Sequence, residues 1–334
     1  MSDTQPRKHH TVSAGYMRRF AGDLNTVRVH HAQRGVFDTG PSGIGHQLDY
    51  WGSAKLAGQV ESRFSRIESD ALRLLSRLKD RWPLADADRA ALGQFLAIHI
   101  VRLPSFGGNL RQFEARAMRK VLQEKAPEHG LTERQAAAIT EQQRSHLAHA
   151  NNLLRQVPRI ASALCSMHWT IVEFDHDWLI SCDQPVVLLA AEQRNVSPAS
   201  AIQPFGLMNT FEGRFTLDPR RALLLTWHEV PDGSWLSGER PQACSINCAL
   251  KAQTLREWFC RPGTAPPFLT PPILRDEVLP ISISLLPGYT LERASASRRR
   301  HAAEQLIANV IEEQTPPNEV RWTRVSDVTG VGVS

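Results

Sequence analysis

The sequence predicts an α+β fold, because the spacing of apolar residues changes once along the chain. Residues 56–164 carry apolar side chains three and four positions apart, which lines up one face of a helix. Residues 168–260 instead contain short runs of β-branched and aromatic residues between polar turns. A small hairpin is predicted at 24–40. We therefore expect a hairpin, a helical section, and a mostly antiparallel sheet with a covering helix.

The helical section divides into several helices. The apolar stripe of the first comprises Val60, Phe64, Ile67, Ala71, Leu74, Leu75 and Leu78. The step Trp82-Pro83 ends this helix, and Asp86 is a suitable cap for the next one. Further helices are predicted at about 109–124 and 132–163.

The later part of the chain supplies the sheet and a boundary. The predicted strands are 169–174, 178–180, 185–189, 214–217 and 222–227. The segment from Cys244 to Cys260 returns to helical spacing and is the predicted covering helix. A Pro-rich stretch then follows, so we expect one domain over 1–262 and a linker with a C-terminal extension packed on it over 263–334.

Composition excludes several classes of protein. With 42% hydrophobic and 22% charged residues in 334, the chain is neither disordered nor collagen-like, and it can bury a large core. The net charge of +5 comes mainly from Arg, which suits an anionic partner such as nucleic acid and equally suits a GC-rich genome.

The chain shows no sign of a membrane or an oxidising compartment. No apolar run approaches the roughly 20 residues needed to span a bilayer, and the first residues do not resemble a signal peptide. Five cysteines, an odd number in apolar or helical surroundings, suit buried thiols rather than a disulfide framework. We expect a cytoplasmic protein.

A series of motifs along the chain resembles a known family. The motifs are KHHTVSAGYMRRFAG at 8–22, Arg102-Leu103-Pro104, SCDQPV at 181–186, TLDPRRALL at 216–224 and INCAL at 246–250. In this order, over about residues 7–260, they resemble a widespread bacterial family named domain of unknown function 4238. Thr11, Ser13 and Gln184 depart from its usual residues. The resemblance implies the fold and singles out polar positions. It implies no activity, because the family has no established one.

Two of these motifs contain candidate catalytic residues. His9 and His10 follow one another, so on an extended segment only one of them can face a given site. A neutral imidazole can accept a proton near pH 7. Asp183 lies between apolar strands and needs a partner if it is buried, either a catalytic His that it orients or a structural Arg.

Candidate substrate-binding residues come from the same motifs. Arg19 and Arg102 could hold an anion, although Arg102 also suits a buried ion pair. Gln184 and Asn247 could contact a substrate, and Asn247 equally suits a helix N-cap. His99, near Arg102, is more typical of a hydrogen-bonded core histidine.

We predict no metal site and no cofactor. His146 and His149 lack the Glu of a zinc-hydrolase motif, and the cysteine spacing does not match a zinc site. The Gly-rich stretch 39–45 has the wrong spacing for a phosphate loop and is expected to be an ordinary loop.

The leading hypothesis from the sequence is a metal-independent hydrolase, similar to a nuclease, that cleaves a phosphodiester in RNA or another nucleic acid. In it, His9 or His10 transfers a proton, Asp183 orients the imidazole, and Arg19 and Arg102 bind the anion. The alternative is a non-catalytic binding or regulatory module that senses an anionic ligand or a partner protein. A third reading is an interaction domain in which these polar motifs are internal scaffolding.

Overall fold

The computed structural model describes residues 8–48, 54–103, 106–107, 132, 134, 146–190, 207, 210–228, 230–264 and 266. Helices and sheets both build the core, which confirms the α+β class. The predicted helix at 109–124 and nearly all of the expected extension over 263–334 lie outside the described residues. Among the described helices, none has both the length and the apolar character needed to cross a bilayer.

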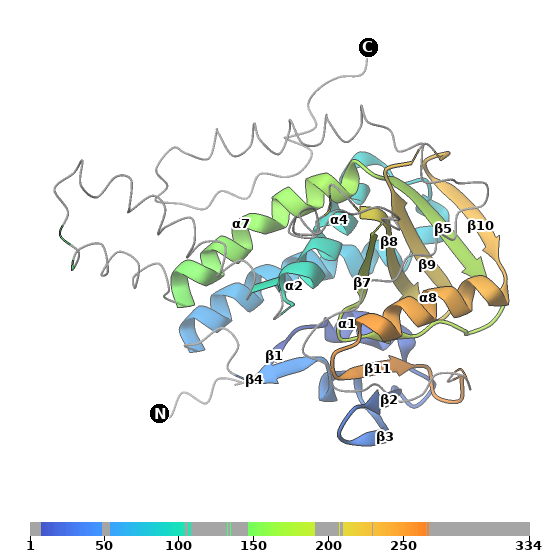
Figure 1. Cartoon of the computed structure of the whole chain (residues 1–334), viewed down its shortest axis with the longest axis horizontal. Helices are drawn as coiled ribbons and strands as arrows, with labels where there is room; N and C mark the ends of the chain where they lie inside the picture. Colours follow the sequence, from blue (N-terminus) through green and yellow to red (C-terminus); the bar gives the residue numbers. More distant parts are fainter. Residues whose placement is uncertain are drawn as a thin grey trace, which may run out of the picture.

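The central element is a five-stranded sheet with the strand order β10-β5-β9-β8-β7 (Figure 1). Its strands are β5 (His168–Phe174), β7 (Val186–Ala190), β8 (Thr210–Asp218), β9 (Arg221–Thr226) and β10 (Ser234–Gly238). All neighbouring pairs are antiparallel except β10 and β5, which run parallel at one edge. The prediction of a mostly antiparallel sheet is confirmed.

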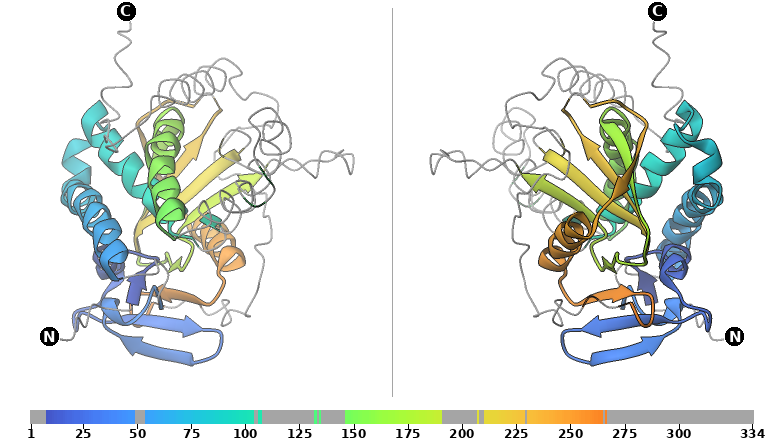
Figure 2. Two further views of the ribbon diagram at one scale, coloured as in Figure 1. Left: turned by 90° about the vertical axis from the view of Figure 1, so that its left-hand side faces the viewer. Right: turned by 90° about the vertical axis from the view of Figure 1, so that its right-hand side faces the viewer.

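Alternating side chains on these strands fill two separate cores. On β5, Trp169 and Ile171 pack with the long helices, whereas Val172 and Phe174 pack with the helix on the opposite face. The long helices are α2 (Ala54–Leu75), α4 (Asp86–Val101) and α7 (His146–Cys165), and the covering helix is α8 (Arg240–Gln253). Figure 2 shows α8 and the long helices on opposite sides of the sheet. A single turn of helix, α3 (Leu78–Arg81), follows α2.

A second, four-stranded sheet joins distant parts of the chain. Its order is β3-β2-β11-β6, and every neighbouring pair is antiparallel. The strands are β2 (Val27–His31), β3 (Gly35–Thr39), β6 (Ser181–Cys182) and β11 (Glu257–Cys260). The β2–β3 pair confirms the hairpin predicted at 24–40. Separately, β1 (Lys8–His10) pairs antiparallel with β4 (His46–Leu48), after the short helix η2 (Pro41–Gly43).

The first helical turns connect both sheets through one hydroxyl. Tyr16 lies on α1 (Ala14–Met17), which continues into η1 (Arg18–Phe20). The Tyr16 hydroxyl donates to the carbonyl of Thr216 at 2.6 Å and lies 2.7 Å from the Ser181 Oγ. Burial raises the pKa of Tyr16, so the hydroxyl keeps its proton and remains a donor.

The structure corrects four details of the sequence prediction. The segment to Cys260 is not helical throughout: the chain leaves the helix at Thr254, and β11 follows because it pairs with β2 and β6. Residues 178–180 form no strand, and β10 was not predicted. Asp86 is the first residue of α4 rather than its cap, which is Ala85.

His99 confirms the expectation of a core histidine. Its ring is fully buried between the rings of Phe95 and Tyr16, and its Nδ1 lies 2.9 Å from the Phe95 carbonyl. The backbone N–H of Ser13 donates to Nε2 at 3.5 Å. The imidazole is therefore held in its neutral form, and burial lowers its pKa to about 4.

This burial predicts a pH dependence of stability. Unfolded His99 binds a proton near pH 6.5, whereas folded His99 does so only near pH 4, so stability is lost as pH falls between these values. We expect this difference in the pKa of His99 to lower the free energy of unfolding by about 2 kcal/mol between pH 7 and pH 5. Urea unfolding at both pH values should show a smaller fall in the free energy of unfolding for His99→Gln than for the wild type. Parallel losses in the two proteins would contradict this account.

Candidate functional site

The pairing of β1 with β4 brings two imidazoles together. His10 and His46 are partners in the register, and their ring centroids lie 6.1 Å apart with the rings nearly perpendicular. Both side chains are half-buried. The Nδ1 atom of each ring is buried and has no hydrogen-bond partner among the described residues. His9 lies on the same strand in register with Gln47, and its side chain is outside the described part of the structure.

Arg102 is close enough to His10 to affect its ionisation. Burial, and next the charge of Arg102, lower the pKa of His10, while Glu61 and Glu68 oppose this. His10 is therefore a neutral imidazole near pH 7, able to accept a proton.

Arg102 itself is buried in an ion-pair network. Its Nη1 donates to a carboxylate oxygen of Glu68, and its Nη2 donates to Glu61 at 3.3 Å. The guanidinium also lies 4.3 Å from the centre of the Phe64 ring. Two carboxylates of α2 thus compensate the charge of Arg102, and its role in binding an anion stays a prediction.

Asp183 uses its carboxylate to hold backbone rather than another side chain. Its two oxygens accept from the backbone N–H groups of Leu255 at 3.0 Å, Arg256 at 2.7 Å and Glu257 at 3.4 Å. The backbone N–H of Asp183 also donates to the carbonyl of Glu257 at 3.0 Å. Burial raises the pKa of Asp183 to about 6, and the first two of these N–H groups oppose that rise.

The segment that Asp183 holds contacts the strand that carries His46. The Glu257 carboxylate accepts the backbone N–H of Gly45 at 2.8 Å. The Arg256 Nη2 donates to the carbonyl of His46 at 3.4 Å. Asp183 is thus connected to the imidazole pair through the start of β11, and no imidazole is among its described hydrogen-bond partners.

Arg256 is a site residue that sequence reasoning missed. It is half-buried beside His46 and makes no ion pair with any described carboxylate within 4.0 Å. Apart from the donor that contacts the His46 carbonyl, its guanidinium N–H groups are therefore available for an anion next to β4. Arg256 stands in no recognised motif, so only the folded position reveals it. His46 was also missed, although the glycine before it marks a special turn.

Arg19 and Asn247, two other predicted site residues, make contacts away from the imidazole pair. Arg19 donates from Nε to the Leu217 carbonyl at 2.7 Å and from Nη2 to Asp218 at 3.0 Å. Asn247 accepts the backbone N–H of Ile180 and donates to the Trp178 carbonyl. It lies inside α8, so the N-cap interpretation is wrong.

Gln184 is buried two residues after the end of β6. Its side-chain Nε2 has no hydrogen-bond partner among the described residues, and its backbone carbonyl accepts from the Cys182 thiol at 3.1 Å. No described group of three or more His, Cys, Asp or Glu residues could hold a metal ion. All five cysteines are free thiols.

The fold and this site define an α+β protein in which two histidines are paired across β1 and β4, and an arginine just before β11 contacts the backbone of β4. The chain belongs to the family described as protein of unknown function (DUF4238), which matches residues 8–257. That match begins in β1, ends at the first residue of β11, and includes His10, His46, Asp183 and Arg256. Neither a curated protein nor a solved structure matches the chain.

Replacing the Asp183 carboxylate should destabilise the fold. In Asp183→Asn, one amide oxygen replaces two carboxylate oxygens, so buried N–H groups at 255–257 lose their acceptor. We expect a loss of about 1 to 3 kcal/mol at pH 7. Urea unfolding measures it, with Asp175→Asn as the matched control, because Asp175 is exposed. Equal stability of both variants would contradict the bridging role.

Gly45 should be required for the position of His46. Its φ of +64° is left-handed, and a Cβ there would lie 3.0 Å from Met17 and 3.2 Å from Val12. We expect Gly45→Ala to cost about 1 to 3 kcal/mol in the free energy of unfolding. Gly40→Ala is the control, since Gly40 has a φ of −64° and open space around it. Similar losses in both would refute the requirement.

Proposed function

We propose that this chain is a hydrolase that cleaves a phosphodiester by acid–base catalysis, with RNA or another nucleic acid as its substrate. The observation that carries the proposal is the pair of half-buried imidazoles, His10 and His46, together with Arg256, which donates to the backbone carbonyl of His46 and makes no ion pair with a described carboxylate. These groups supply proton acceptance, proton donation and binding of a negatively charged phosphoryl group.

The reaction needs two proton transfers. One imidazole accepts the proton of the attacking water or hydroxyl as the new P–O bond forms. The other donates a proton to the leaving oxygen as the old P–O bond breaks. Neutral His10 suits the first role, because burial and the nearby Arg102 charge lower its pKa. Arg256 stabilises the charge that develops on the phosphoryl oxygens.

Asp183 enters this proposal as a positioning residue. It holds the backbone of Arg256 and Glu257, which in turn contact His46 on β4 and Gly45 just before it. This differs from the dyad expected from the sequence, in which Asp183 would orient an imidazole directly. The cytoplasmic location also stays a prediction.

The proposal predicts activity that depends on both imidazoles. Single-stranded RNA, single-stranded DNA and bis(p-nitrophenyl) phosphate are suitable probes, assayed with and without a chelator. We expect His10→Ala and His46→Ala each to lower turnover by about 10²-fold or more. His176→Ala is the control, because His176 is exposed and its ring contacts Trp178 instead. Arg256→Ala should lower kcat and kcat/KM together, because the charge that Arg256 stabilises develops in the transition state.

Two outcomes would end the enzymatic proposal. Cleavage that persists in both histidine variants would assign the activity to another site or to a contaminant. Thermal stabilisation by these phosphodiesters that requires Arg256, with no product formed, would instead support the non-catalytic binding module.

A further inference from the structure

The turn of the β2–β3 hairpin lies directly beside Arg256. The backbone N–H of Ala32 in this turn donates to the carbonyl of Arg256 at 2.8 Å. In the pairing of β2 with β11, His31 is the partner of Glu257, the residue after Arg256. Figure 1 shows the hairpin, β11 and the β1–β4 pair at the same end of the molecule. A ligand that contacts Arg256 therefore lies close to the hairpin turn.

His31 offers one hydrogen-bond donor to this surface. Its Nδ1 accepts the backbone N–H groups of Gln33 at 3.0 Å and Arg34 at 3.2 Å. Burial lowers the pKa of His31, Glu257 opposes this, and the two neighbouring arginines add to it, so the ring is neutral near pH 7. Because Nδ1 is an acceptor, the proton of the neutral ring is on Nε2, which has no hydrogen-bond partner among the described residues.

Arg34 lies on the same face of the hairpin as His31. Its guanidinium carbon is 4.1 Å from the centre of the Phe37 ring. Phe37 pairs with Val29, and Val29 is two residues from His31, so these side chains share one face of the sheet. Arg34 is exposed and makes no ion pair with any described carboxylate within 4.0 Å. Its charge is therefore available for an anion beside His31.

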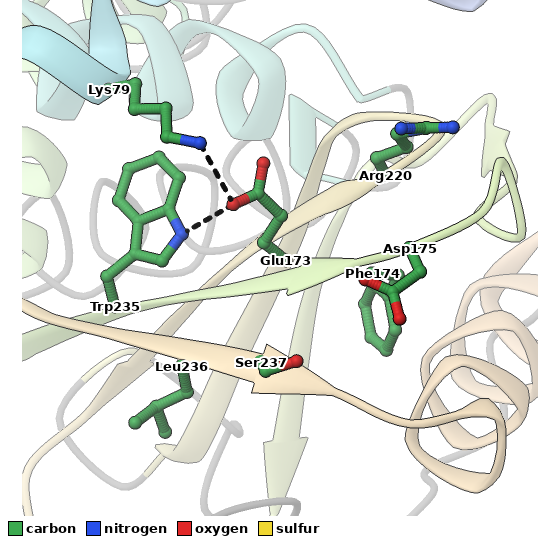
Figure 3. A pocket seen from close by; sticks show the side chains of 8 residues that line it. All are labelled: Lys79, Glu173, Phe174, Asp175, Arg220, Trp235, Leu236 and Ser237. Atoms are coloured by element: carbon green, nitrogen blue, oxygen red, sulfur yellow. Dashed lines mark hydrogen bonds and ion pairs between the residues drawn. The ribbon is translucent and has the colours of Figure 1, made fainter.

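An open pocket at the ends of β5 and β10 is less suited to an anion, because its cations have carboxylate partners. It has a volume of about 340 Å³, and its lining includes Lys79 and Arg220 (Figure 3). Lys79 lies 3.9 Å from the Glu173 carboxylate, and the Arg220 Nε donates to Asp177 at 2.8 Å. An anion in the pocket competes with these carboxylates, whereas one at the hairpin turn does not.

The available donors follow one another from β4 to the hairpin turn. Arg256 contacts the carbonyl of His46 on β4, and the turn contacts the carbonyl of Arg256. The charges of Arg34 and Arg256 both act on the His31 ring, so the three side chains are neighbours. Proteins that bind single nucleic-acid strands use positive groups that follow the phosphate backbone. A row of donors of this kind suits successive phosphates of one strand.

We propose that His31 and Arg34 bind the phosphate next to the one that is cleaved, so that the substrate is a polynucleotide strand rather than a small phosphodiester. Arg256 binds the cleaved phosphate, and the strand continues over the hairpin turn. This inference rests on the proposed function, because it takes the cleaved phosphate as its neighbour. Contacts to phosphate carry no base information, so strand length rather than sequence raises the affinity.

Equilibrium binding of two DNA probes tests the proposal, since the contacts are to phosphates that DNA and RNA share. The unphosphorylated dinucleotide TpT has a single phosphate, whereas a deoxythymidine decamer has a row of them. Both are titrated into His10→Ala, which lacks one of the two proposed proton-transfer groups and leaves the probes intact. We expect the decamer to bind at least about tenfold more tightly than TpT, the effect of one added contact to a charged group.

A second substitution in this background identifies the added contact. Arg34→Ala should weaken the decamer about tenfold and leave TpT within about twofold. The slope of log K against log salt concentration for the decamer should become less negative by about 0.7, the value for one phosphate contact on a single strand. Thermal unfolding checks that the variant is folded, and a fold defect alone does not change this slope.

Two further variants separate the donors from the turn and from net charge. His31→Asn keeps an acceptor for the turn N–H groups and removes the Nε2 donor, so it should weaken the decamer about fivefold. Arg28→Ala is the matched control, because Arg28 pairs with Asp38 at 2.9 Å and lies on the opposite face of β2 from His31. It should leave the affinity for the decamer within about twofold.

The proposal is overturned if the decamer binds no more tightly than TpT, or if Arg34→Ala and His31→Asn both leave its affinity unchanged. Equal losses for Arg34→Ala and Arg28→Ala also overturn it, because they reduce the effect to net charge. Cleavage of bis(p-nitrophenyl) phosphate by the wild type tests the proposed function separately, since this probe has one phosphate. If decamer binding depends on Arg34 but no probe is cleaved, the proposed function fails and strand binding at the hairpin is supported.

Discussion

The carboxylate of Asp183 and the backbone N–H groups of residues 255–257 form the interaction on which the rest of the site depends. A buried carboxylate is tolerated only when hydrogen bonds replace its water. Here the donors are the backbone N–H groups that follow the C-terminus of α8, outside the hydrogen-bond ladder of the helix. Asp183 therefore fixes the place where β11 begins, and β11 is an inner strand of the four-stranded sheet.

From this fixed point, contacts extend to the N-terminal part of the chain. Glu257 holds Gly45, and Arg256 contacts His46, so the start of β11 determines where β4 lies. β4 in turn pairs with β1 and places His46 opposite His10. The candidate site thus combines residues from both ends of the described chain. The positions of the two imidazoles thus depend on Asp183, although no described hydrogen bond joins Asp183 to either ring.

The spacing of apolar residues correctly predicted the elements whose conformation is set by nearby residues in the sequence. The apolar stripe through Val60 and Phe64 became α2, and the β-branched run after Trp169 became β5. β11 was mistaken for helix, because Trp258 and Phe259 fit helical spacing until pairing with β2 and β6 decides the conformation. The need of Asp183 for a partner was predicted, but backbone donors carry no sequence signal. The pairing of His10 with His46 depends on strand register, which residue types alone do not specify.

The most direct test is a pH titration followed by NMR in the wild type and in Asp183→Asn. The backbone amide signals of Leu255 and Arg256 should titrate with the Asp183 carboxyl, at a pKa of about 6, and this titration should vanish in the variant. The His10 ring should titrate alike in both proteins, since burial and Arg102 set its pKa. If the amides are insensitive and the His10 pKa falls in the variant, Asp183 binds the imidazole directly and the account is wrong.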